Sequence, residues 1–283
     1  LWMVAAMASR LAAALTALSA VSAAVADEDR VSTAAWTTSY ESGRIFYFRN
    51  GVRVSPWHDI PFVAGDDDIP DRPLLSFVCE IPRGTSAKVE IHKTYPHNPL
   101  VQDIHKDGSL RYYMYSPAIV NYGAVPQTWE DPSVPDEHTG LGGDNDPIDV
   151  LQLNESPCAA GAVQRIRVLG ALALIDGGET DWKLLVIDVD DPDAPSWTDV
   201  ADIPPKRLEE VREWYRMYKT AEGKGENEYG LGGEAIDAAA AMAVARGTHK
   251  FWKAPEGRTQ CEFKGQTCWG MGVRAGVSGH DEL

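Results

Sequence analysis

Residues 142–151 read GGDNDPIDVL: a glycine pair comes first, and three aspartates then alternate with other residues and lead into an apolar run. The glycine pair and Pro147 are incompatible with a regular helix, and they predict a tight turn that enters an extended segment. Residues two apart in an extended chain share a face, so Asp144 and Asp146 should point the same way. Asp149 should point to the opposite face unless a bend at Pro147 turns it back.

The three aspartates repel one another, and a divalent cation is the simplest way to keep all of them ionised. Oxygen ligands suit Mg²⁺, Mn²⁺ or Ca²⁺ rather than a metal that prefers thiolates. A solvated acidic loop is the usual alternative for a short charge cluster, but the apolar residues that follow indicate that the segment enters a buried strand. An EF-hand does not fit, because Ile148 and Asp149 occupy the fifth position and the required glycine of such a loop.

A second block of sequence extends this pattern. The chain reads NYGAVPQTWEDP in residues 121–132 and GDNDPIDVL in residues 143–151. Together the blocks closely resemble the family I soluble inorganic pyrophosphatases in their eukaryotic form, and the resemblance spans roughly residues 36–254. It implies a closed, highly twisted, OB-like β-barrel with two main flanking helices. It also implies hydrolysis of inorganic diphosphate to two orthophosphates by direct attack of water.

Strand patterns between residues 44 and 189 support a mainly β (α+β) fold independently of the resemblance. Residues 44–48 and 52–54 read as strands, and Asn50-Gly51 between them is a strong hairpin signal. Residues 75–81 are almost continuously apolar, which predicts a buried strand.

Residues 163–189 read as a long hairpin. A glycine pair permits its turn, and the turn can bring Asp176 and Asp181 together at one end of the sheet. Beyond this hairpin the hydrophobic period becomes helical. One helix is expected to end near Tyr218, and a second, alanine-rich helix should run from about residue 234 to 252.

The resemblance implies a set of metal ligands. Six carboxylates would hold the cations, and Glu80 would act from an outer position. The six are Asp144, Asp146, Asp149, Asp176, Asp181 and Glu90. The expected ion is Mg²⁺, with Mn²⁺ as a substitute, and it would screen the substrate and lower the pKa of a bound water toward about 7. Asp146 is expected to orient and deprotonate that water.

Basic and phenolic side chains complete the implied site as ligands of the phosphates. They are Lys88, Arg111, Tyr122, Lys183, Tyr218 and Lys219. Lys88, Arg111 and Tyr122 are expected to act with Asp146 in catalysis. Without the resemblance, Arg111 reads as a surface arginine, and Lys88 with Glu90 reads as a weak surface pair on one face of a strand.

One position departs from the family. Relatives usually carry a tyrosine four residues before Tyr122, where this chain has Ala118. A hydroxyl near the electrophilic phosphate or the leaving group would then be missing. Tyr115 is a candidate substitute, although its spacing differs. The departure bears on the turnover rate more than on the type of reaction.

Charge limits the partners. The formal net charge is −16, which disfavours nucleic acid and anionic membranes. An acidic protein that handles diphosphate needs metal ions and a local basic cluster. An acidic Ca²⁺-binding protein retained in the endoplasmic reticulum (ER), with weak or no activity on the same fold, is the alternative, but such a protein has no use for the basic cluster. A hydrolase of other phosphate anhydrides and a homo-oligomer also stay open.

We expect three parts: a signal peptide in residues 1–26, the barrel domain in residues 27–254 and a flexible tail in residues 255–283. Arg10 precedes an apolar run that is too short for a membrane span, and Ala24-Val25-Ala26 is a good signal-peptidase site. The final tetrapeptide, HDEL, matches an ER retention signal. Together these segments predict the ER lumen, with the cytoplasm, as for most of the family, or the mitochondrion as alternatives.

The four cysteines lack zinc-finger spacing, so a structural zinc site is not expected. In an oxidising lumen, Cys261 and Cys268 could close a short loop of the tail. Cys79 falls in an apolar strand pattern and is expected to be a small buried hydrophobic residue.

Overall fold

The computed structural model describes residues 36–69, 71–253, 262–263 and 266–270. The expected signal peptide, the HDEL sequence and Cys261 lie outside these residues, so the pairing of Cys261 with Cys268 stays a prediction. Within the described part of the chain, no helix combines the length and the apolar character needed to cross a membrane.

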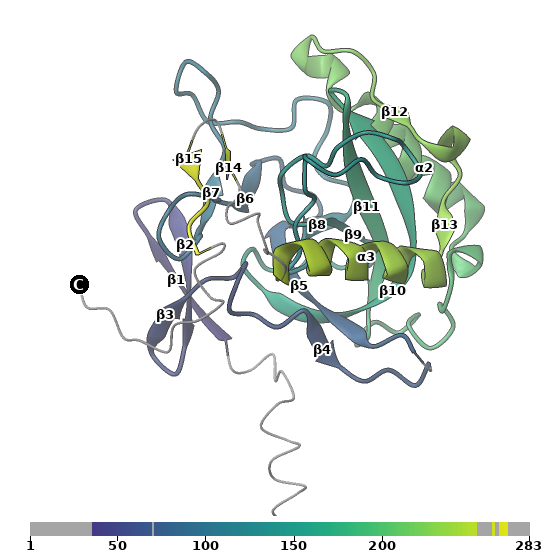
Figure 1. Ribbon diagram of the computed structural model, residues 1–283, viewed down its shortest axis with the longest axis horizontal. Helices are drawn as coiled ribbons and strands as arrows, with labels where there is room; N and C mark the ends of the chain where they lie inside the picture. The colour runs from purple at the N-terminus through teal and green to yellow at the C-terminus, as the bar shows by residue number, and fades with distance from the viewer. Residues whose placement is uncertain (1–35, 70, 254–261, 264–265, 271–283) are drawn as a thin grey trace, which may run out of the picture. The chain divides into compact units, whose positions relative to one another are not determined.

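The main sheet has eight strands (Figure 1). They are β4 (Val63–Gly65), β5 (Leu74–Ile81), β8 (Asn121–Ala124), β9 (Asp149–Gln152), β10 (Val163–Asp176), β11 (Glu179–Asp188), β12 (Glu228–Tyr229) and β13 (Ile236–Asp237). The strand order is β12-β10-β11-β9-β8-β5-β4, and β13 pairs with β10. The first residues of β10, Val163 to Ile166, also pair with β5, so the series of pairings returns from β5 to β10.

A smaller sheet has five strands. Three of them come before the main sheet in the sequence, and two lie between its strands β5 and β8. It consists of β1 (Trp36–Glu41), β2 (Arg44–Arg49), β3 (Val52–Val54), β6 (Val89–Ile91) and β7 (Leu100–Gln102). The predicted hairpin between β2 and β3 is confirmed, and Asn50 and Gly51 both have positive φ, 53° and 78°. In the tail, β14 (Glu262–Phe263) pairs with β15 (Gln266–Thr267).

The strands β10 and β11 are apolar on both faces. Leu185 and Ile187 belong to one apolar cluster, here the first cluster, whereas Leu184 and Val186 belong to another, the second cluster. Successive side chains of a strand point to opposite sides, so the two clusters lie on opposite faces of these strands. The long hairpin predicted from residues 163–189 is therefore buried on both sides.

Two α-helices cover these clusters in the described part of the chain, α2 (Pro205–Met217) and α3 (Ala238–Lys253). α2 packs Val211 and Trp214 into the first cluster, and α3 packs Ala241 and Met242 into the second, where it contacts β10 (Figure 1). α3 begins later than predicted because the preceding residues pair with β10 as β13. The predicted mainly β fold with two helices is confirmed.

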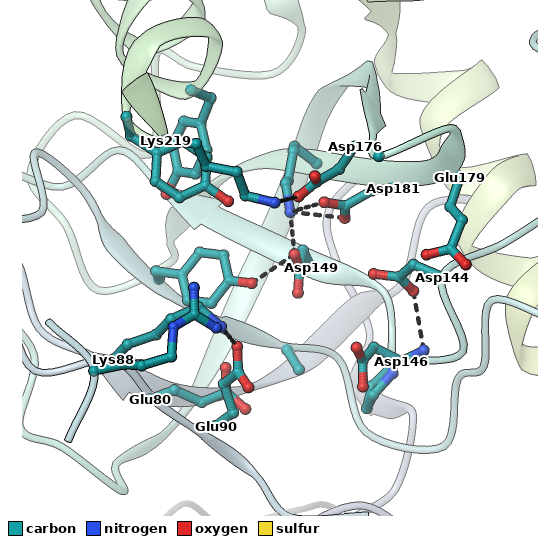
Figure 2. A pocket seen from close by; sticks show the side chains of 18 of the residues that line it. Glu80, Lys88, Glu90, Asp144, Asp146, Asp149, Asp176, Glu179, Asp181 and Lys219 are labelled. Atoms are coloured by element: carbon teal, nitrogen blue, oxygen red, sulfur yellow. Dashed lines mark hydrogen bonds and ion pairs between the residues drawn. The ribbon is translucent and has the colours of Figure 1, made fainter. Parts of the chain in front are cut away.

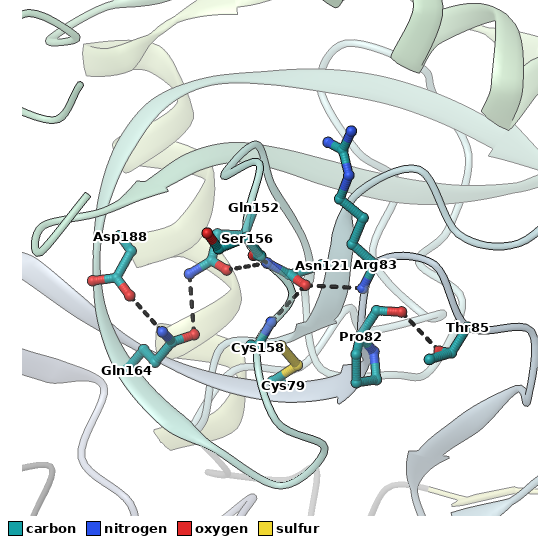
Figure 3. Close-up of a disulfide and its surroundings, with 10 residues drawn as sticks. All are labelled: Cys79, Pro82, Arg83, Thr85, Asn121, Gln152, Ser156, Cys158, Gln164 and Asp188. Atoms are coloured by element: carbon teal, nitrogen blue, oxygen red, sulfur yellow. Dashed lines mark hydrogen bonds between the residues drawn. A yellow bond between two sulfur atoms is a disulfide. The ribbon is translucent and has the colours of Figure 1, made fainter. Parts of the chain in front are cut away.

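A disulfide joins Cys79 on β5 to Cys158 in the loop between β9 and β10 (Figure 3). The expectation that Cys79 is only a small buried hydrophobic residue is therefore wrong, although it does lie in the second cluster. Cys158 N also donates a hydrogen bond of 2.9 Å to Asn121 Oδ1. The cysteines are 79 residues apart, and spacing alone does not indicate which distant segments the sheet brings together.

We expect Cys158→Ala to lower the free energy of unfolding by about 4 kcal/mol, because the bridge closes a long loop and restricts the unfolded chain. Urea unfolding under non-reducing conditions measures this loss. Adding Cys79→Ala to Cys158→Ala should cost much less than the first substitution, since the bridge is already absent. A Cys158→Ala protein as stable as the wild type would contradict the expectation.

Candidate active site

A cavity of about 360 Å³ is lined by side chains from β5, β6, β8, β9, β10 and β11 and from the turn after α2 (Figure 2). All the site residues predicted from the sequence line this cavity. They are Glu80, Lys88, Glu90, Arg111, Tyr122, Asp144, Asp146, Asp149, Asp176, Asp181, Lys183, Tyr218 and Lys219. The structure thus brings together acids and bases that the chain separates widely.

The acidic turn is held close to the chain before it. A Cβ on Gly143 would lie 2.4 Å from the Glu130 carbonyl carbon, so only glycine fits there. Asp146 N donates a hydrogen bond of 2.9 Å to Asp144 Oδ1, and Asn145 has a φ of 72°. The segment therefore bends, which is why Asp149 lines the same cavity as the other two aspartates and not the opposite face.

Glu80 reaches the cavity through a β-bulge. The pairing of β5 with β8 shifts between Cys79 and Ile81, so Glu80 has no partner across the ladder. Glu80 Oε1 accepts a hydrogen bond of 2.8 Å from Ile91 N, which ties β5 to β6. Burial, together with the nearby Asp149 carboxylate, raises the pKa of Glu80 to about 8.

Lys183 lies at the centre of the buried charges. Its Nζ forms ion pairs with Asp149 and with Asp181, the latter at 2.7 Å. Burial opposes protonation of Lys183, but these two carboxylates outweigh it and raise its pKa well above the usual value. Tyr122 donates a hydrogen bond of 2.6 Å to Asp149 Oδ2. Asp181 is itself so buried that its pKa rises to about 7.

Further ion pairs extend along the cavity wall. Lys88 pairs with Glu90, and Lys219 pairs with Asp176 (Figure 2). Burial lowers the pKa of Lys88, and the Arg111 guanidinium adds to this effect. Lys88 and Glu90 do share one face, as the strand pattern predicted, and both side chains line the wall of the cavity.

Glu130 is a candidate metal ligand that the sequence reasoning missed. Carboxylate oxygens of Glu130, Asp144 and Asp181 lie within 4.8 Å of one another. Glu130 Oε1 accepts from Trp182 N at 3.0 Å, whereas Oε2 is buried and has no hydrogen-bond partner in the described part of the chain. Burial and the neighbouring carboxylates raise the pKa values of Glu130 and Asp144 well above their usual range. Three mutually repelling carboxylates with an orphaned oxygen fit a divalent cation.

The acidic end of the block in residues 121–132 was the available sign for Glu130, but only Tyr122 of that block was assigned to the site. Glu130 itself lines a neighbouring cavity, and the residues of the main cavity that were missed are Lys93, Tyr113, Glu179, Tyr215 and Lys224. Lys93 forms an ion pair of 2.6 Å with Asp146. Ala118 and Tyr115 line a different cavity, beside Arg83 and Arg207, so Tyr115 does not supply the hydroxyl expected near the phosphates.

Comparisons with known proteins agree with this arrangement. The family model described as inorganic pyrophosphatase matches residues 77–253. The chain is 46% identical over 211 residues to the inorganic pyrophosphatase of Mus musculus, covering 72% of this chain and 71% of that protein. It is 45% identical over 217 residues to that of Zygosaccharomyces bailii, covering 74% of each.

Solved structures show the same likeness. The type I inorganic pyrophosphatase of Toxoplasma gondii matches with a TM-score of 0.71 and 39% identity, over 76% of this chain and 97% of that one. A truncated vacuolar soluble pyrophosphatase of Trypanosoma cruzi, crystallised in complex with PPi, matches with a TM-score of 0.72 and 37% identity. This second match covers 77% of this chain and 89% of that one.

We expect the protein in a metal chelator to lose stability as the pH rises, and Glu80→Gln to lose less. The folded protein keeps the Glu80 proton up to about pH 8, whereas an unfolded chain releases it near pH 4.5. The stability that this proton provides is fully present below about pH 4.5 and is lost as the pH rises through about 8. Between these pH values the unfolding free energy of the wild type should fall more steeply than that of Glu80→Gln, by about 1 kcal/mol per pH unit.

Urea unfolding at several pH values measures the two slopes. Glu155→Gln is the matched control, because Glu155 is exposed and only pairs with Arg83 at the surface. Its slope should equal that of the wild type. Equal slopes for Glu80→Gln and the wild type would show that Glu80 is ionised in the folded protein.

Proposed function

The chain belongs to the family I inorganic pyrophosphatases and hydrolyses inorganic diphosphate, and from this premise we propose how its side chains do so. The observation that carries the proposal is the mixed charge of one cavity. Eight carboxylates and six basic side chains line it together. Carboxylates can hold metal cations, and basic side chains add further positive charge. Both are needed in the same place when a strongly anionic molecule has to be held and cleaved.

We propose that the resident metal is Mg²⁺, with Mn²⁺ as a substitute. Asp144, Asp149 and Asp181 would hold it with Asp146, Asp176 and Glu90, and Glu130 joins Asp144 and Asp181 because their oxygens converge. Glu80 would act from an outer position, because it accepts a hydrogen bond from Ile91 N, next to Glu90 in the chain. Bound Mg²⁺ would screen the negative charge of diphosphate and acidify a water molecule.

Asp146 is proposed to orient that water and accept its proton. Its side chain has an exposed fraction of 42%, so it is open to solvent and substrate, unlike the buried acids behind it. Lys93 holds one of its oxygens at 2.6 Å and fixes its direction. The described lining of the cavity contains no serine, threonine, cysteine or histidine, and we assign most of its carboxylates to metal binding, so direct attack by water is proposed rather than a covalent intermediate.

The phosphate ligands are proposed to be Lys88, Arg111, Tyr122, Lys183, Tyr218 and Lys219. In the structure, Lys88 and Lys219 each neutralise a carboxylate that is itself a proposed metal ligand. Carboxylates that hold a cation no longer need these ammonium groups. The lysines can then turn to the phosphate oxygens and stabilise the charge that develops on the leaving phosphate.

The Ca²⁺-binding alternative is less well supported. A protein that only stores calcium gains nothing from basic side chains that compete for its carboxylates. Here Lys183 is buried beside two of those carboxylates, and a hydrolase can use such an ammonium group to bind phosphate, whereas a calcium store cannot. A wild-type protein that binds Ca²⁺ but releases no phosphate from diphosphate with Mg²⁺ or Mn²⁺ would reverse this judgement.

We expect Asp146→Asn to lower the rate of phosphate release with Mg²⁺ at least about 100-fold, because a general base contributes that much or more. Steady-state phosphate assays across a Mg²⁺ titration measure the effect. Asp190→Asn is the control, since Asp190 is exposed and pairs with Arg165 at the surface. If Asp146→Asn keeps half of the wild-type rate, another group accepts the proton.

We also propose that the protein resides in the ER lumen. The Cys79–Cys158 disulfide supports an oxidising compartment, because structural disulfides are rare in the cytosol. An epitope inserted in the exposed turn at Asp190 should overlap with a lumenal marker, and removing the four residues of HDEL should send the protein into the medium. A cytosolic or mitochondrial signal from the intact protein would contradict this.

A further inference from the structure

Residues 111–113 form a short extended segment against residues 86–88. Lys88 N donates to Arg111 O at 3.1 Å, and Tyr113 N donates to Ser86 O at 2.7 Å. Successive side chains of an extended segment alternate in direction. Arg111 and Tyr113 accordingly both line the main cavity, whereas Tyr112 lines no part of it and has an exposed fraction of 44%.

The ring of Tyr113 is buried and fixed. It has an exposed fraction of 6% and makes edge contacts with Trp214 and with Tyr218, whose centroid is 5.7 Å away. Its backbone is held by the bond to Ser86. The phenol can therefore not swing out of the cavity without losing this packing.

The hydroxyl of Tyr113 has no hydrogen-bond partner among the described residues. Two other tyrosine hydroxyls without partners, those of Tyr47 and Tyr215, are fully enclosed by protein atoms. That of Tyr113 is not, and Tyr113 lines the cavity, so its hydroxyl opens on the space proposed for diphosphate. A fixed donor that faces a cavity built for an anion is placed to bind that anion.

The surroundings define what this hydroxyl can do. Burial, with Tyr215 and Tyr218 nearby, raises the pKa of Tyr113 well above its usual value, so it stays protonated at neutral pH and can donate a hydrogen bond. The ring of Tyr113 contacts that of Tyr218, and the positive charge of Lys183 acts on its hydroxyl. Tyr218 and Lys183 are both proposed phosphate ligands. A group that stays neutral there is neither a base nor a nucleophile.

We propose that Tyr113 is a further catalytic residue, whose hydroxyl donates a hydrogen bond to a phosphate oxygen of diphosphate beside Tyr218 and Lys183. The proposal rests on the phosphate-binding roles of Lys183 and Tyr218 proposed above.

The test is Tyr113→Phe, which removes the hydroxyl and keeps the ring and its packing. We expect kcat/KM for diphosphate with Mg²⁺ to fall at least about 10-fold, the effect of a hydrogen bond to a charged group. Tyr112→Phe and Tyr115→Phe are matched controls, since neither ring lines the main cavity. Both should stay within about twofold of the wild type.

A second readout does not depend on turnover. Calorimetric titration with methylenediphosphonate, a diphosphate analogue that cannot be hydrolysed, should show weaker binding to Tyr113→Phe than to either control. The midpoint of thermal unfolding should be the same in all four proteins, which separates loss of the hydroxyl from loss of packing.

The proposal is overturned if Tyr113→Phe keeps kcat/KM within about twofold of the wild type, a change too small for such a bond. It is also overturned if the two control variants lose as much activity as Tyr113→Phe. Neither result touches the proposed function, which stands or falls with phosphate release by the unsubstituted protein.

Discussion

Charge pairing inside a buried cavity is the constraint on which the site depends. Lys183 has an exposed fraction of 3% and lies between Asp149 and Asp181, both also buried. A buried charge without a partner is costly, so the ammonium group and the two carboxylates are stable only together. The strand register produces this arrangement. Lys183 on β11 pairs directly with Asp149 on β9, and Asp181 lies two residues earlier on the same face as Lys183.

The apolar scaffold makes that register hard to shift. β11 is packed on both faces, so a slip of one residue would move Leu184 and Leu185 into each other's clusters and turn Lys183 into an apolar environment. Gly123 adds a further restraint, because a Cβ there would lie 1.9 Å from Val78 O. The charged side chains of the site are therefore held in the cavity, and their positions follow from the packing of apolar residues on the same strands.

The residues predicted from the sequence do line one cavity, but several contacts that shape this cavity could not be predicted. The aspartates of the acidic turn could be assigned because their spacing and apolar surroundings are local features. Glu130 and the Cys79–Cys158 bridge could not, since both depend on contacts between distant segments that only the sheet topology defines. Tyr113 lay within reach of sequence reasoning. Once Arg111 is placed in the cavity, the period of two puts Tyr113 on the same side.

The local field also explains how so acidic a chain can bind a multiply charged anion. The net charge of the chain is −16, yet the cavity lining holds six basic groups against eight carboxylates. Salt screens surface charges over about 10 Å, so the distant acids matter little beside these groups. Each cation bound by the carboxylates adds two positive charges, so one cation brings the formal balance inside the cavity to zero and a second makes it positive. A neutral hydroxyl such as that of Tyr113 completes this site without altering the balance, because it binds a phosphate oxygen and needs no carboxylate to neutralise it.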